Sequence, residues 1–126
     1  MKTRLCTLAL AALLVPLMAM AQADKKTERT WKSKCASCHG ADGKGQTDQG
    51  KKMKVADYTS SAWQKSKKDD DLKKAITEGV SQEHDGVKQE MPAFKDSVPP
   101  EDVDKLVAHV RSLGAKKAAK KAKAKK

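Results

Sequence analysis

The chain has few of the residues that normally fill a protein core. After residue 23, only twelve of the remaining 103 residues are Leu, Ile, Val or Phe. A share below about 20% together with a high net charge, here +11 for all 126 residues, is typical of a disordered chain. This excludes a large core built from aliphatic side chains alone. Any compact domain in this chain needs another source of buried apolar surface.

Two further absences narrow the fold class. No segment alternates between apolar and polar residues with period two, so we expect no half-buried strand, and residues 80–100 are expected to form a loop. No internal repeat is present. The longest apolar run, residues 5–20, has sixteen residues, which is short of the roughly 18 that a membrane-spanning helix requires.

The apolar run belongs to a predicted signal peptide. Two positive residues precede it within the first four positions, and residues 21–23 have the small-x-small pattern of a cleavage site. We expect residues 1–23 to be removed by cleavage after Ala23, or alternatively after Ala21, and Cys6 to be discarded with them. The mature protein is then exported, to the periplasm of a bacterium, and keeps two cysteines.

The mature chain contains several short predicted helices. One helix runs into the first remaining cysteine, a second surrounds Trp63, and a third covers residues 69–78 with Gly79 as its end. The clearest helix follows Pro99-Pro100 and is expected to end at Gly114. Its apolar stripe has helical spacing and consists of Val103, Leu106, Val107, Val110 and Leu113.

Two cysteines and a histidine stand close together as Cys35, Cys38 and His39. On a helix, Cys38 lies three residues and His39 four residues after Cys35, so the three side chains can approach one side of the same turn. This C-x-x-C-H pattern has three possible explanations. They are a disulfide, part of a zinc site, and the attachment point of a c-type haem.

Haem attachment is the explanation that uses all three residues. A redox disulfide is expected beside a βαβ pattern, which the chain lacks. A closed structural zinc site takes four ligands, and no second Cys/His pair exists. Two thiols can reach the vinyl groups of one haem while the imidazole reaches its iron. The apolar macrocycle would also supply the missing core.

Haem iron held by one histidine leaves its opposite face open, and the residue that fills this position decides function. The candidates are Met53, Met91, His84 and His109. Met91 is preferred because Pro92 restricts it to extended backbone just before the last helix. We expect Met53 to be partly buried packing, His84 to be a surface residue, and His109 to lie at the edge of the core.

From Trp31 to Leu113 the chain resembles the small periplasmic class I cytochromes c. The resemblance rests on the C-x-x-C-H motif and its glycine-rich loop, on Met-Pro-Ala-Phe at residues 91–94, and on the last helix. It implies an all-α, small cytochrome c fold. In this fold three to five short helices wrap around one covalently bound haem, and the first and last helices cross.

The resemblance also implies the site residues. Haem c is attached through Cys35 and Cys38, and His39 and Met91 are the axial ligands of its iron. Residues 24–114 then form one monohaem domain. Such proteins often hold the proximal imidazole through a proline carbonyl in the following loop. This loop has no proline, so another backbone carbonyl is expected to accept the Nδ1 proton of His39.

Histidine–methionine ligation leaves no position for oxygen or peroxide and raises the reduction potential. We therefore expect a one-electron carrier without a catalytic constellation, not an enzyme. As a monomer it would meet redox partner proteins through a small, short-lived contact. Two alternatives remain, a haem enzyme or gas sensor with an open distal position, and a cytochrome subunit of an oxidase or dehydrogenase complex.

Residues 115–126 are predicted to be a disordered Lys/Ala-rich tail. The tail has seven lysines and no acidic residue, whereas residues 24–114 are close to neutral, with 18 basic and 16 acidic residues. It is expected to be a solvated extension, or to bind an anionic membrane surface or an acidic redox partner. Nucleic acid is not expected as a partner outside the cytoplasm.

Overall fold

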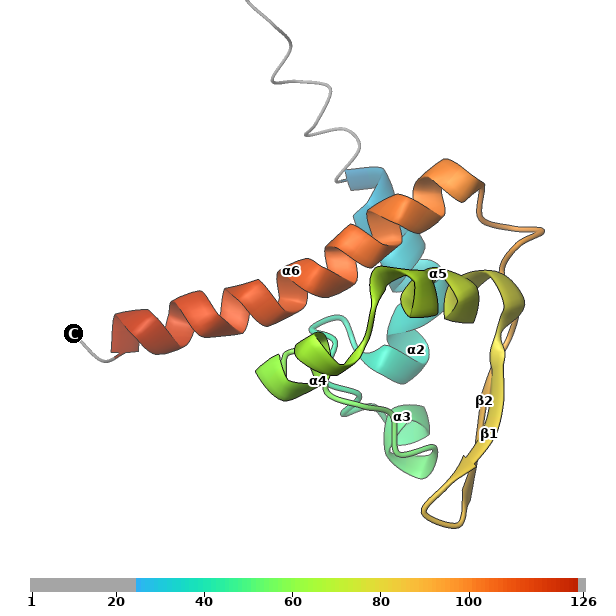
Figure 1. The fold of residues 1–126 in the computed structure, drawn as a ribbon, viewed down its shortest axis with the longest axis horizontal. Helices are drawn as coiled ribbons and strands as arrows, with labels where there is room; N and C mark the ends of the chain where they lie inside the picture. The colour runs from blue at the N-terminus through green and yellow to red at the C-terminus, as the bar shows by residue number, and fades with distance from the viewer. Residues whose placement is uncertain (1–24, 125–126) are drawn as a thin grey trace, which may run out of the picture.

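The computed structural model describes residues 25–124, and the predicted signal peptide lies outside these described residues. The described chain starts as a helix at residues 25–30, continues through the π-helical turn η1 (Trp31–Cys35), and ends this first helical segment with α2 (Ala36–His39). The expected helix leading into the cysteines is therefore present. It delivers the C-x-x-C-H motif on one continuous segment (Figure 1).

Three short helices and a hairpin follow, and one long helix closes the fold. Figure 1 shows α6 running across the molecule, with the N-terminal helix crossing it near its beginning and the hairpin lying apart from it. The bounds are α3 (Asp48–Lys52), α4 (Ser61–Ser66), α5 (Asp69–Glu78), β1 (Val80–His84), β2 (Val87–Met91) and α6 (Pro100–Ala124).

Local side chains begin the three short helices. Helices α4 and α5 match predicted helices, whereas no helix was predicted at α3. The Thr47 hydroxyl accepts from the Gly50 N–H at the start of α3, at 2.9 Å, and the Ser60 hydroxyl accepts from the Trp63 N–H at the start of α4. At α5, the Asp71 carboxylate accepts from the Lys68 N–H at 3.1 Å. Gly79 ends α5 with a φ of 78°, a left-handed conformation that favours glycine.

The buried core is small and comes mostly from α6. All five residues of its predicted apolar stripe are buried, which confirms the predicted face of this helix. The Lys26 Nζ lies 2.7 Å from an Asp102 carboxylate oxygen, and the ring of Trp31 lies 5.0 Å from that of His109. These contacts hold the crossing of the first and last helices. The buried apolar residues are Trp31, Leu72, Val98, Val103, Leu106, Val107, Val110 and Leu113.

The expectation of a loop over residues 80–100 is wrong for its first half. Residues 80–91 form an antiparallel hairpin in which Val80 pairs with Met91 and His84 with Val87. Asp85 and Gly86 make the two-residue turn, with φ values of 50° and 72°, and Asp-Gly is a strong signal for such a turn. The sequence shows no alternation of apolar and polar residues here, because the face of the hairpin that lines the pocket carries glutamine and histidine as well as apolar residues.

The last helix also differs from its expected end at Gly114. In the structure α6 continues to Ala124, so residues 115–124 are helical and not a disordered tail. Alanine and lysine are both strong helix formers, and one glycine costs only about 1 kcal/mol relative to alanine. Gly114 instead allows close packing, because a Cβ there would lie 2.7 Å from the Cγ of Gln64. Within residues 25–124, no helix has the length and apolarity needed to cross a membrane.

A polar network joins α6 to α4, to the loop that follows α4 and to the start of α5. The Arg111 guanidinium donates to the Gln64 carbonyl at 2.7 Å and to the Lys67 carbonyl at 2.6 Å, and it pairs with the Asp69 carboxylate at 2.7 Å. The amide of Gln64 in turn donates to the Val110 carbonyl at 2.9 Å. In a protein with so small a core, these bonds fix α4 against the long helix.

We predict that Arg111→Ala lowers the free energy of unfolding by about 2 kcal/mol, because it leaves two carbonyls and a carboxylate without their shared donor. Urea unfolding followed by circular dichroism measures this loss. Lys117→Ala is the matched control, because Lys117 makes an exposed ion pair with the Asp57 carboxylate at 3.5 Å, and its expected loss is within about 0.5 kcal/mol. Equal losses in the two variants would contradict the assigned role of Arg111.

Candidate functional site

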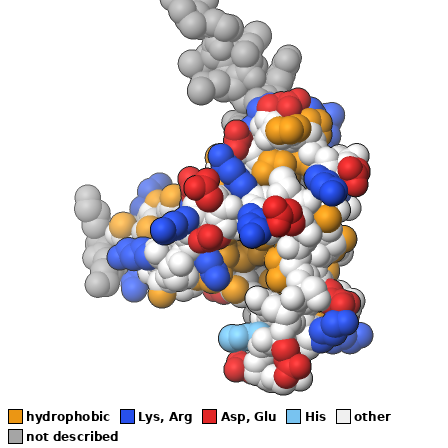
Figure 2. Space-filling model, turned by 45° about the vertical axis from the view of Figure 1, so that its right-hand side comes forward, with side chains coloured by type: hydrophobic (Ala, Val, Ile, Leu, Met, Phe, Trp, Pro, Cys, Tyr) orange, Lys and Arg blue, Asp and Glu red, His pale blue; other side chains and the backbone are white. Residues whose placement is uncertain are grey.

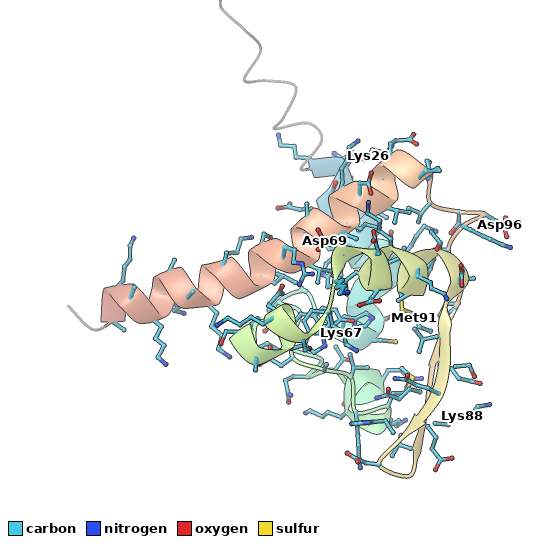
Figure 3. The ribbon with its side chains drawn as sticks, in the orientation of Figure 1. Lys26, Lys67, Asp69, Lys88, Met91 and Asp96 are labelled. Atoms are coloured by element: carbon cyan, nitrogen blue, oxygen red, sulfur yellow. The ribbon has the colours of Figure 1, made fainter. Side chains whose placement is uncertain are left out.

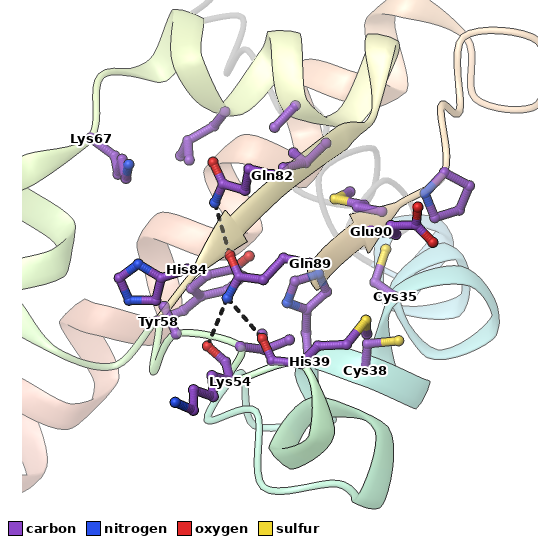
Figure 4. A pocket seen from close by; sticks show the side chains of 18 of the residues that line it. Cys35, Cys38, His39, Lys54, Tyr58, Lys67, Gln82, His84, Gln89 and Glu90 are labelled. Carbon is purple, nitrogen blue, oxygen red and sulfur yellow. Dashed lines mark hydrogen bonds between the residues drawn. The ribbon is translucent and has the colours of Figure 1, made fainter. Parts of the chain in front are cut away.

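A pocket of about 520 Å³ lies between the C-x-x-C-H segment, α5 and the hairpin. Its walls include Cys35, Cys38 and His39 from the first helical segment and Met91 from the end of β2. Figure 4 shows the two cysteines and the histidine beside the hairpin residue Gln89. The structure therefore brings all four predicted site residues to one cavity, whose volume falls within the range of about 300–1,000 Å³ usual for ligand sites.

The two cysteines present free thiols to this pocket. Neither forms a disulfide, and both are partly buried. Burial raises the pKa of the Cys35 thiol to about 11, so the thiol is protonated at neutral pH. The described residues contain no group of three or more His, Cys, Asp and Glu side chains that could hold a metal ion.

His39 is held in an aromatic cluster. Its ring stacks on Tyr58 with centroids 4.9 Å apart, and the Trp31 ring lies 5.9 Å away. Burial lowers the pKa of His39 to about 4, so the imidazole is neutral at neutral pH and has a lone pair to offer. Neutral imidazole is the form that binds metals.

The expectation that a backbone carbonyl accepts from His39 Nδ1 is wrong in this structure. This nitrogen is buried without a hydrogen-bond partner. The nearby carbonyls serve the loop instead, because the His39 carbonyl accepts from the Gly45 N–H at 2.8 Å and the Gly40 carbonyl accepts from Trp31 Nε1 at 3.1 Å. Stacking on Tyr58 therefore orients the His39 ring in place of the expected hydrogen bond.

Helix α3 fixes the motif from the other side. The Cys38 carbonyl accepts from the Thr47 hydroxyl at 3.0 Å, and the same hydroxyl caps α3 by accepting from the Gly50 N–H. A Cβ at Gly50 would collide with the Cys38 carbonyl oxygen. Glycine is therefore required where α3 packs directly against α2.

Met91 is positioned by the C-terminal end of α5. A Cβ at Gly79 would lie 2.5 Å from the Met91 carbonyl oxygen, so glycine allows this close approach as well as the positive φ. The Phe94 N–H donates to the Ile76 carbonyl at 2.9 Å, which fastens the chain just beyond Met91. Figure 3 shows Met91 at the end of the hairpin nearest α5.

The other three candidate ligands occupy different places. Met53 and His84 also line the pocket, but the His84 side chain is 60% exposed and lies 3.4 Å from the Asp85 carboxylate. His109 does not line it. It lies against Trp31, with Nε2 buried and unpaired. The expectations of surface exposure for His84 and of a core-edge position for His109 are confirmed.

Several polar pocket residues were missed in the sequence. Gln82, Gln89 and Lys54 line the cavity, and the first two are joined by a hydrogen bond of 2.8 Å. The Asp-Gly pair at residues 85–86 predicts a hairpin turn. Every second residue of the two flanking strands then lies on one face, and this pattern could have identified Gln82 and Gln89.

The donor set fits a c-type haem. Two free thiols three residues apart, a neutral imidazole next to the second, and a thioether from another element surround a cavity with apolar walls. Among its apolar lining residues are Leu72, Ala75 and Phe94. Thiols, imidazole and thioether are the groups that hold haem c and its iron in proteins.

Comparison with known proteins agrees with this arrangement. The family model described as "Cytochrome C oxidase, cbb3-type, subunit III" matches residues 22–110. Among solved structures, the "KustC0563 c-type cytochrome" is similar over 69% of this chain and 95% of its own, with 29% sequence identity and a TM-score of 0.58. No curated protein matches the chain. The expected small cytochrome c fold is thereby confirmed, and the chain belongs to the family of cbb3-type cytochrome c oxidase subunit III, as a small c-type cytochrome.

Proposed function

We propose that the protein is an exported one-electron carrier with a single haem c, attached through Cys35 and Cys38, and with His39 and Met91 as axial ligands. The observation that supports this most directly is the convergence of these four side chains on one pocket of about 520 Å³. The family match supports a haem-binding electron carrier.

Each of the four residues has a defined task in this proposal. The Cys35 and Cys38 thiols form the thioethers, and the imidazole of His39 offers its lone pair without first losing a proton, because burial keeps it neutral. The Met91 thioether completes the coordination. When bound, haem c supplies one-electron redox chemistry, and histidine–methionine ligation raises its potential.

Electron transfer requires contact with partners but no binding site for a small substrate. We propose that the mature protein begins after Ala23, acts in the periplasm as a monomer, and meets redox proteins through contacts of under about 1,200 Å². The signal-peptide pattern of residues 1–23 supports the location.

A second candidate function is supported by the family match. The matched family is described as a subunit of cytochrome c oxidase, so the chain would transfer electrons within an oxidase complex instead of diffusing freely. The site residues and their roles are the same in both cases. Co-purification with an oxidase from the native membrane supports this candidate, and recovery as a free monomer from the periplasmic fraction supports the carrier.

The proposed ligand leads to a prediction for Met91→Ala. Loss of the thioether should lower the reduction potential by on the order of 0.1 V, within the roughly 0.8 V that axial ligands span. The reduced variant should also bind carbon monoxide readily, whereas the unmodified protein should not. Potentiometric titration and visible spectra with and without the gas measure both effects.

Met53→Ala is the control for this prediction, because Met53 is the second methionine that lines the pocket. It should keep the unmodified potential and resist carbon monoxide. If Met91→Ala behaves as the unmodified protein does, Met91 is not the ligand. If the unmodified protein itself binds the gas, the alternative of an enzyme or sensor with an open distal position is correct.

We also propose that the basic end of α6 attracts an acidic redox partner. At 100° per residue, its lysines fall on one side of the helix, and Ala115, Ala118, Ala119 and Ala122 fall on the other, while Ala124 lies among the lysines. The apolar side has only alanine, which is too small to insert well into a membrane, and this favours an acidic protein over lipid. Figure 2 shows lysines along this protruding end. The lysines are Lys116, Lys117, Lys120, Lys121 and Lys123.

Removal of residues 115–126 tests this role. The truncated protein should bind soluble polyglutamate about tenfold more slowly at low salt, and no more slowly at 1 M salt, where charges are screened within about 3 Å. Stopped-flow mixing gives the rates. Equal rates of the two proteins at low salt would contradict the proposal. If truncation weakens binding to anionic phospholipid vesicles but not to polyglutamate, the lysines bind a membrane surface instead.

A further inference from the structure

The side chain of Gln89 spans the gap between the hairpin and the chain that follows α3. Its Nε2 donates to the Met53 carbonyl at 2.7 Å and to the Lys54 carbonyl at 3.1 Å, and its Oε1 accepts from Gln82 Nε2 at 2.8 Å. Figure 4 shows these three bonds at the pocket. The amide thus uses both of its N–H groups and its oxygen, and no other pocket-lining side chain makes as many bonds within residues 25–124.

The two acceptor carbonyls belong to the turn that ends α3. Lys54 has a φ of 49°, a left-handed conformation that is costly for any residue with a Cβ. A second bond joins the same turn to the hairpin, because Lys54 Nζ donates to the Asp85 carbonyl at 3.2 Å. The tip and the middle of the hairpin are therefore both tied to residues 53–54.

Through α3, this contact reaches the C-x-x-C-H segment. Thr47 at the start of α3 donates to the Cys38 carbonyl, and Gly50 in its middle packs against the same carbonyl. The hairpin that carries Met91 is thus connected, through Gln89 and one five-residue helix, to the backbone of a haem-binding cysteine. Position 89 is also two residues before Met91, so both side chains lie on the pocket face of β2.

We propose that Gln89 is a positioning residue that holds the hairpin closed and thereby keeps the Met91 sulfur in place over the pocket. This inference rests on the proposed role of Met91 as axial ligand. Without Gln89, the hairpin keeps the bond from the Phe94 N–H to the Ile76 carbonyl just beyond Met91, and the exposed Lys54 bond at its tip. An isolated two-stranded hairpin is marginally stable in water, so its opening would carry the sulfur away.

The experiment measures how easily an added ligand replaces the sulfur. Imidazole is titrated into the oxidised holoprotein and followed by the visible spectrum. Gln89→Ala should bind imidazole about tenfold more tightly than the unmodified protein, the ratio expected when the two bonds that join the hairpin to residues 53–54 are lost. Gln89→Glu should shift in the same direction, since a carboxylate of equal size cannot donate to two carbonyls. Circular dichroism of each holoprotein establishes that it is folded.

Lys88→Ala is the matched control, because Lys88 is a neighbouring exposed residue of the same strand that forms an ion pair with Glu90. Its imidazole affinity should stay within about twofold of the unmodified protein. Gln82→Ala removes a single bond from the Gln89 amide and should have an intermediate effect. Unmodified affinity in both Gln89 variants, or an equal increase in Lys88→Ala, overturns the positioning role.

Met91→Ala separates failure of this inference from failure of the proposed function. If Met91→Ala binds imidazole far more tightly while the Gln89 variants behave as the unmodified protein does, Met91 is the ligand and Gln89 does not position it. If Met91→Ala binds imidazole with the same affinity as the unmodified protein, Met91 is not the ligand, and both the proposed function and this inference are wrong.

Discussion

The structure depends on an apolar cavity that the polypeptide does not fill by itself. The described residues include only eight buried apolar side chains, five of them from the single face of α6, while about 520 Å³ remains open between the first helical segment, α5 and the hairpin. A chain so poor in aliphatic residues cannot offset the entropy of folding with its own core. In the proposed function, a covalently held haem would supply that surface, which would explain how so charged a chain folds.

Close packing of the backbone positions the residues that line this cavity. Glycine at positions 50 and 79 lets α3 approach Cys38 and lets the end of α5 approach Met91. Aromatic stacking orients His39, whose Nδ1 has no hydrogen-bond partner. If His39 holds the iron as proposed, the missing Nδ1–H donation would leave its imidazole less basic than one that donates to a carbonyl.

Much of this arrangement could be predicted from the sequence, for identifiable reasons. The cysteines and histidine are local, so their spacing alone predicts a shared face, and the stripe of α6 follows from simple periodicity. The hairpin was missed because Gln82, His84 and Gln89 are polar although they face the pocket. Glycine commonly ends a helix, so Gly114 predicts an end of α6 there, whereas in the structure it makes room for Gln64. The unpaired Nδ1 of His39 depends on which carbonyls the loop uses, and sequence spacing does not specify this.

The most direct test of the account is the mass and colour of the purified protein after denaturation. The account predicts a red protein whose denatured polypeptide starts at Asp24 and keeps the mass of one haem, with neither Cys35 nor Cys38 open to alkylation. A colourless protein that folds compactly, with both thiols free to react, would contradict it.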